Sequence, residues 1–231
     1  MQALALIDDT ATATSVLRAA RGIAALAGLT VVAIHAQEEG QQTAPVETTE
    51  DLPLHVIDGH PERVLLEAVE SPHVRLAVLG SRTNPEDTRP TGHLAELLLS
   101  STLKPLLLVG PGCHLPADNR FRHALVPLDG SPSATLAARE TLRLFGQGGL
   151  DVLALHVFDE RTVPSFFDQP QHEFPRLVDE LARQGGDGTS RIAFGSGSAA
   201  PAVVAAANTA GIDLVVLSWS RRLRPGHGHV I

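Results

Sequence analysis

The stretch ALALID at residues 3–8 returns in changed form as ALVPLD at residues 124–129, an offset of 121 residues. The next apolar run keeps this offset, because VVAIHA at 31–36 corresponds to VLALHV at 152–157. Two separate apolar runs that share one spacing are typical of an internal repeat. The sequence therefore predicts that one α/β unit occurs twice in tandem.

Apolar runs alternate with helical patterns along the first copy. A continuous apolar run is typical of a strand covered on both faces, and apolar residues three or four apart predict a helix. Strands joined through helices pair in parallel by right-handed crossovers. The predicted strands are 3–8, 30–36, 54–58, 75–80 and 105–109, and the predicted helices follow Thr10, begin at Pro61 and cover 93–101.

The second copy repeats this order with one longer insert. Its predicted strands are 123–129, 150–157, 191–195 and 212–218, and its predicted helices are 131–145, 172–184 and 199–210. The fold class is therefore α/β, with two tandem open parallel-sheet domains of Rossmann-like type, five strands in the first and about four in the second. The predicted domains are 1–113 and 121–231.

The end of the second copy is shorter than that of the first. We expect its last helix and strand to be missing, either because the chain is a fragment or because the copy ends at an uncovered sheet edge. An open edge promotes association. We therefore expect self-association, either between the two domains or in a homodimer.

Composition excludes several classes of protein. The net charge of −8 argues against a nucleic-acid-binding surface, which needs clustered Lys and Arg. The single cysteine, Cys113, excludes an internal disulfide and fits a reducing cytoplasm. No signal peptide is recognised, and no apolar run approaches the ~20 residues of a membrane span. These features predict a cytoplasmic protein that binds neither membranes nor nucleic acids.

Four stretches resemble the universal stress protein family: VPLDGSPSA at 126–134, LHVFDE at 155–160, and LGSR at 79–82 followed by LLLSSTLKPLLLV at 97–109. The resemblance covers nearly the whole chain as a tandem pair. It implies adenine nucleotide alpha hydrolase-like domains, dimerisation, a role in the stress response, and either ATP binding or its loss. The ATP-binding branch carries Gly-x2-Gly-x9-Gly-Ser after the fourth strand, where glycines let backbone amides approach phosphates at a helix N-terminus.

The resemblance matches the phosphate-binding motif only in part. Gly80, followed by Ser81, matches the first glycine of the first copy, and Gly92 substitutes for the second. Ser100-Ser101 stands where Gly-Ser is expected. In the second copy this motif is lost, because serine and arginine replace the two glycines.

The base-binding side is also divided between the copies. Asp8 and Asp129 match the acidic residue that lies near adenine and ribose in the family. Pro127 and Val157 fit the family pattern in the second copy, whereas Ala36 replaces the valine in the first. ATP is therefore the cofactor to consider, in a site that neither copy holds complete.

Structural roles also account for these residues. Either aspartate could cap the helix that follows it, Gly80 could be a turn glycine, and the two serines could be surface residues late in a helix. His35 and His156, which share the repeat offset, suit core or rim positions better than catalysis.

No nucleophile and base combine into a catalytic pattern, and no metal-ligand spacing is found. We therefore expect a protein without enzyme activity. Two hypotheses remain: a regulatory or interaction protein of the stress response in which nucleotide binding is partly or wholly lost, or an ATP-binding stress protein with its site in the first domain.

Overall fold

The computed structural model describes residues 1–8, 12–37, 52–81, 92–128, 143, 145, 149–158 and 191–218. The chain divides into two compact units, Met1–Arg120 and Phe121–Ile231. Each unit is described by itself below.

The first unit is built on a five-stranded parallel sheet. Its order is β3-β2-β1-β4-β5, with β1 in the centre and β3 and β5 at the edges. The bounds are β1 Gln2–Ile7, β2 Thr30–Gln37, β3 Leu54–Asp58, β4 Val74–Gly80 and β5 Leu106–Val109. The prediction of five parallel strands in the first domain is confirmed.

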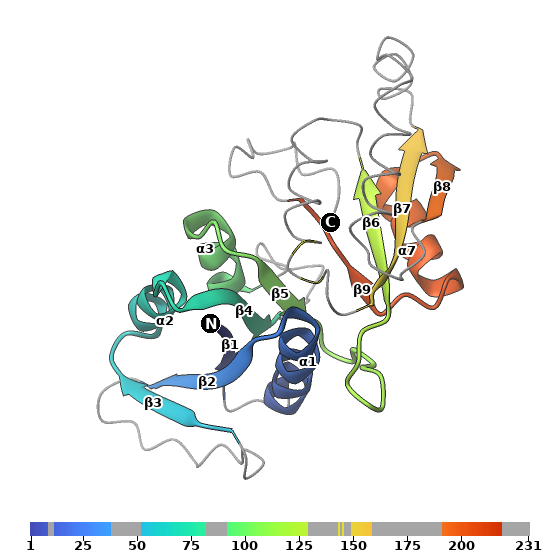
Figure 1. Ribbon diagram of the computed structural model, residues 1–231. Coiled ribbons are helices and arrows are strands. Elements are labelled where there is room, and N and C mark those ends of the chain that lie inside the picture. The colour runs from blue at the N-terminus through green and yellow to red at the C-terminus, as the bar shows by residue number, and fades with distance from the viewer. Residues whose placement is uncertain are drawn as a thin grey trace. The chain divides into compact units, whose positions relative to one another are not determined.

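Helices cover both faces of this sheet (Figure 1). One face carries α1 (Thr12–Ala27), which is followed by Gly28 with a φ of 64°, a conformation that glycine adopts readily. The other face carries α2 (Pro61–Glu70) and α3 (His93–Ser101), and the core between them and the sheet includes Leu65 and Leu98.

The second unit has a four-stranded parallel sheet of order β8-β7-β6-β9. Its elements are β6 His123–Leu128, β7 Asp151–Phe158, β8 Arg191–Ser196, α7 Ala199–Thr209 and β9 Leu214–Val215. Leu125, Leu155, Val157 and Val203 form a core between this sheet and α7. Four strands are as predicted. The helix predicted at 172–184, and all but two residues of the one at 131–145, lie outside the described residues.

The last strand is shorter than predicted. We expected a strand over 212–218, but only Leu214 and Val215 pair with β6. The Val216 amide still donates to the Leu125 carbonyl at 2.8 Å. An apolar run shows that a segment is buried, but it does not show how many of its residues find a partner strand, so the prediction was too long here.

The two sheets have the same register between their central strands. Leu6 pairs with Ile34 in the first, and Pro127 pairs with Leu155 in the second. Each of these positions in the second sheet lies 121 residues after its counterpart, which is the offset seen in the sequence. The order of neighbours also corresponds, since β1 and β6 are each flanked by the next strand on one side and by the fourth strand on the other.

The helices that the structure describes include none with the length and apolar character needed to cross a membrane.

Candidate functional site

The strand order of each sheet marks one position where a ligand can bind. In the first unit the chain proceeds from β1 to β2 and β3 on one side, and then returns to β4 and β5 on the other. In the second unit the same reversal falls between β6 and β9. In open parallel sheets the carboxyl ends of the strands at such a reversal leave a crevice that binds ligands.

Three residues predicted from the sequence follow or end strands at this edge of the first unit. Asp8 directly follows β1, and Gly80 is the last residue of β4. Ser81 is buried, and its amide donates to the Val109 carbonyl at 2.9 Å. The segment that would show whether Asp8 caps α1, residues 9–11, lies outside the described residues.

Gly80 lies against the first helix. A Cβ atom at Gly80 would lie 3.6 Å from Thr12 Cβ and 3.7 Å from Val16 Cγ2, which is ordinary contact. Its φ is outside the left-handed region, and the residue belongs to a strand. Gly80 is therefore a glycine of close strand–helix packing rather than of a turn, and a side chain larger than alanine would press on the first turn of α1.

Gly92 lies at the beginning of α3. It is the N-cap residue, with a φ of 89° and a ψ of 152°, and its carbonyl accepts from the Glu96 amide at 3.1 Å. This is the helix N-terminus that follows β4. The next residue is His93, whose ring contacts the carboxylate of Glu62 in the first turn of α2.

Because Gly92 has a positive φ, we expect Gly92→Ala to lower the free energy of unfolding of the first unit by about 1–2 kcal/mol. Urea unfolding followed by circular dichroism measures the change. Gly110→Ala is the matched control, since its Cβ would lie 3.9 Å from Ser81 Oγ and its φ is unstrained. Equal losses in both variants would contradict the assignment of strain to Gly92.

Ser100 and Ser101 lie at the opposite end of α3. About eight residues at 1.5 Å each separate them from Gly92, which is roughly 12 Å along the helix. The Ser100 hydroxyl donates to the Leu97 carbonyl at 2.9 Å within the helix. Because α3 is followed at once by β5, which is parallel to β4, its C-terminus lies toward the amino edge of the sheet. The structure therefore does not bring these serines to the carboxyl edge.

A lysine marks the same amino edge. The Lys104 ammonium donates to the Val69 and Ser71 carbonyls at 2.6 and 2.5 Å, so two carbonyl groups at the C-terminus of α2 have a hydrogen-bond donor. A cation at this end of a helix is also favoured by the helix dipole.

The base-side residues lie in or after strands. Ala36 is half-buried in β2 and packs against the core beneath α2 and α3. Pro127 is half-buried in β6, and Val157 is buried in β7 against the core beneath α7. Asp129 lies outside the described residues.

The contacts that hold the segment after β5 could not be predicted from the sequence. The Arg18 guanidinium on α1 donates through Nε to Asn119 Oδ1 at 2.8 Å and through Nη2 to the Pro116 carbonyl at 3.1 Å. Asn119 has a φ of 56°, which asparagine tolerates better than most residues. The partners are about a hundred residues apart, so no local pattern could have indicated them.

Arg18 also affects Cys113. Although Cys113 is an exposed residue, partial burial raises the pKa of its thiol above the usual value, and the charge of Arg18 opposes this rise. A raised pKa in the folded protein stabilises it below the pKa of the unfolded chain, about 8.5, and this contribution is lost as pH rises through the folded value. The thiol is therefore protonated at neutral pH, as is typical of an unreactive cysteine.

We expect iodoacetamide at pH 8 to alkylate Cys113 more slowly in the folded protein than in the urea-unfolded chain, because the thiolate fraction is smaller. The pH midpoint of the rate should lie above about 8.5. Mass spectrometry of timed samples measures both. A folded rate equal to or above the unfolded rate would contradict the raised pKa.

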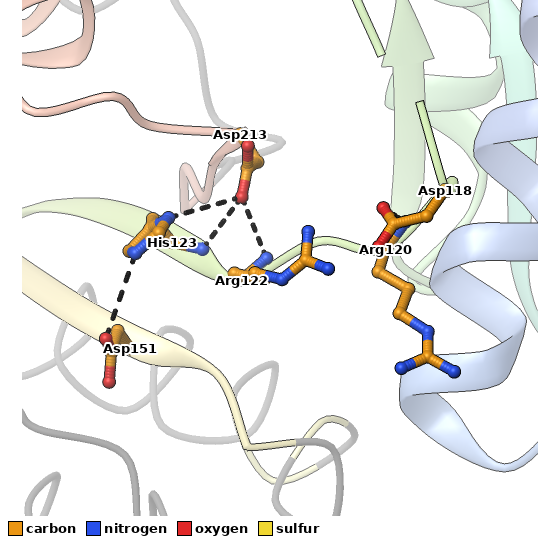
Figure 2. A network of polar contacts seen from close by, with 6 residues as sticks. All are labelled: Asp118, Arg120, Arg122, His123, Asp151 and Asp213. Carbon is orange, nitrogen blue, oxygen red and sulfur yellow. Dashed lines mark hydrogen bonds and ion pairs between the residues drawn. The ribbon is translucent and has the colours of Figure 1, made fainter. Parts of the chain in front are cut away.

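A network of polar contacts lies at the amino edge of the second sheet (Figure 2). One oxygen of Asp213 accepts from the backbone amides of Arg122 and His123 at 2.8 and 3.0 Å. The His123 ring lies 3.5 Å from the same oxygen and 3.9 Å from Asp151. Across the part of the chain that the structure describes, no three ligand-type residues are grouped so as to hold a metal ion.

In the first unit a backbone carbonyl takes the place of this carboxylate. The Gln2 amide, at the start of the central strand, donates to the His73 carbonyl at 2.8 Å. Gln2 and His123 are related by the repeat offset. The network around Asp213 therefore substitutes for part of the sheet ladder, and we assign it to stability rather than to ligand binding.

Comparison with known proteins agrees with this architecture. Residues 120–230 match the family model described as the universal stress protein family. The structure is similar to that of a universal stress protein from Archaeoglobus fulgidus, at 14% identity, 93% of this chain, 85% of that chain and a TM-score of 0.66. It is also similar to a functionally unknown protein from Pseudomonas aeruginosa, at 9% identity, 99% of this chain, 85% of that chain and a TM-score of 0.61. A search of curated proteins found no match. At identities this low, these structural similarities show the fold alone.

Proposed function

Because residues 120–230 belong to the universal stress protein family, we propose that this chain is a regulatory or interaction protein of the stress response that has lost part or all of its nucleotide binding. We further propose that it acts without catalysing a reaction. Its two units are then two copies of the family domain, and the chain associates with itself as a homodimer or through its two units.

The separation of the phosphate-binding residues carries this proposal. Gly92, matched to the second motif glycine, begins α3 and is followed by a histidine in contact with Glu62. Ser100 and Ser101 are at the other end of that helix. A triphosphate at the carboxyl edge would lack the serine hydroxyl and would meet an additional carboxylate.

Thermal unfolding with about 1 mM Mg-ATP tests the proposal. A ligand present at 100 times its Kd stabilises the folded state by about 2.7 kcal/mol, so binding at micromolar affinity would raise the melting temperature clearly. We expect no rise. A rise that already saturates at micromolar Mg-ATP, as an intact site would give, would contradict the loss of nucleotide binding. Light scattering at several concentrations tests the homodimer, and a monomer throughout would contradict it and leave association through the two units of one chain.

A second candidate is an ATP-binding stress protein with its site in the first unit. It is supported by Asp8, Gly80 and Ser81 at one strand edge and by Gly92 at the helix N-terminus that follows. On this hypothesis Mg-ATP raises the melting temperature, and Gly80→Val removes the rise while circular dichroism shows a folded protein. An equal rise in wild type and Gly80→Val would contradict it.

A further inference from the structure

Two buried histidines occupy equivalent places in the two units. His35 is 6% exposed and His156 is 1% exposed, and they lie at the repeat offset in β2 and β7. His35 Nδ1 lies 3.1 Å from the Ile7 carbonyl oxygen, and His156 Nδ1 lies 2.8 Å from the Leu128 carbonyl oxygen. The same side-chain contact is therefore made twice, each time to the last residue of the central strand.

The partner of each ring fixes the position of its proton. A carbonyl oxygen only accepts hydrogen bonds, so Nδ1 must carry the hydrogen that is donated. The neutral ring is then the Nδ1–H tautomer, since the hydrogen bond made by one ring nitrogen determines which nitrogen is protonated. For His35, Nε2 is buried and has no hydrogen-bond partner among the residues that the structure describes. Among the described residues, the hydrogen bond from Nδ1 to the Ile7 carbonyl is therefore the polar contact that holds the His35 ring.

The accepting carbonyls lie where the sheet ends. Ile7 and Leu128 are 5% and 4% exposed, and each is the last residue of its strand. Buried carbonyl groups require hydrogen-bond donors, and the regular ladder stops where the chain leaves the sheet. A side-chain donor from the neighbouring strand joins the two strands at that point.

The residue that follows each of these carbonyls along the chain is an aspartate. Asp8 follows Ile7, and Asp129 follows Leu128. We infer that His35 and His156 are positioning residues that fix the end of the central strand in each unit, and in the first unit also the direction in which the chain continues to Asp8. This inference goes beyond the proposed function and holds whether or not a nucleotide binds.

Two substitutions separate the hydrogen bond from the volume of the ring. Asparagine places an N–H group as many bonds from Cβ as Nδ1, so His35→Asn and His156→Asn keep a donor. His35→Leu and His156→Leu keep volume but remove the donor. His55→Asn, on the edge strand β3, is the control because His55 is exposed.

Long-range 1H–15N correlation spectra of the full-length chain, together with melting temperatures, test the inference. We expect both histidines as the Nδ1–H tautomer. Each leucine variant should melt roughly 5 °C lower and shift the amide resonance of Asp8 or Asp129 in its own unit, while asparagine restores most of both. The His55 control should change neither.

An Nε2–H tautomer in the wild type would overturn the inference. Equal losses in the asparagine and leucine variants would also overturn it, because the donor would then not be what matters. If a leucine variant does not fold, the wild-type tautomer and the asparagine variant still decide the question. None of these results depends on ATP, so failure here is distinct from failure of the proposed function.

Discussion

Replacing Leu125 by alanine is expected to destabilise the second unit by about 2–5 kcal/mol, and Leu4→Ala is expected to do the same to the first unit. Leu4 and Leu125 are 2% and 0% exposed, lie in the central strands and are related by the repeat offset. Their partners in the neighbouring strands, Val32 and Leu153, are related in the same way. Each substitution leaves a cavity in one core and none in the other.

Hydrogen exchange read by mass spectrometry in increasing urea follows the two units separately. Leu103→Ala is the control, because that side chain is 86% exposed and its loss should change stability by less than about 0.5 kcal/mol. The account would be contradicted if either core variant destabilised both units equally, or if Leu4→Ala and Leu125→Ala cost no more than the control.

Asp213→Ala is expected to lower the free energy of unfolding of the second unit by about 1–3 kcal/mol. The carboxylate accepts from two backbone amides at the start of β6, while the Asp213 amide donates to the His123 carbonyl at 3.0 Å (Figure 2). Without the carboxylate these amides lose this acceptor, and the segment that leads into β9 loses one of its contacts with the start of β6. Asp213→Asn keeps an acceptor oxygen and should lose less.

Asp118→Ala is the matched control for Asp213. Asp118 also accepts from a backbone amide, that of Arg120 at 3.1 Å, but this contact is local and exposed (Figure 2). We expect less than about 0.5 kcal/mol from its loss. Urea unfolding by circular dichroism compares the three variants, and an Asp118→Ala loss as large as that of Asp213→Ala would refute the role assigned to Asp213.

The strands were largely predictable because buried parallel strands have continuous apolar runs in their sequence. The strand over 54–58 has the predicted bounds, and Pro61 begins α2 as expected, since proline suits the first turn of a helix. The last strand failed because pairing depends on a partner strand as well as on apolar character. Only Leu214 and Val215 find one in β6.

The site was less predictable because its geometry depends on where a helix begins. The family resemblance placed Ser100 and Ser101 at the phosphate position, whereas the positive φ of Gly92 sets the start of α3. The contacts of His35 and His156 depend on strand register between residues 28 apart. Sequence showed that these histidines match, but their hydrogen bonds appear only once the strands are paired.

A crystal structure of the chain grown with Mg-ATP is the most direct test of the account, which holds that the first unit keeps the family fold but not a working phosphate site. We predict no ordered triphosphate between the end of β4 at Gly80 and the start of α3 at Gly92. Triphosphate density held by the backbone amides of Gly92 and His93 would contradict it.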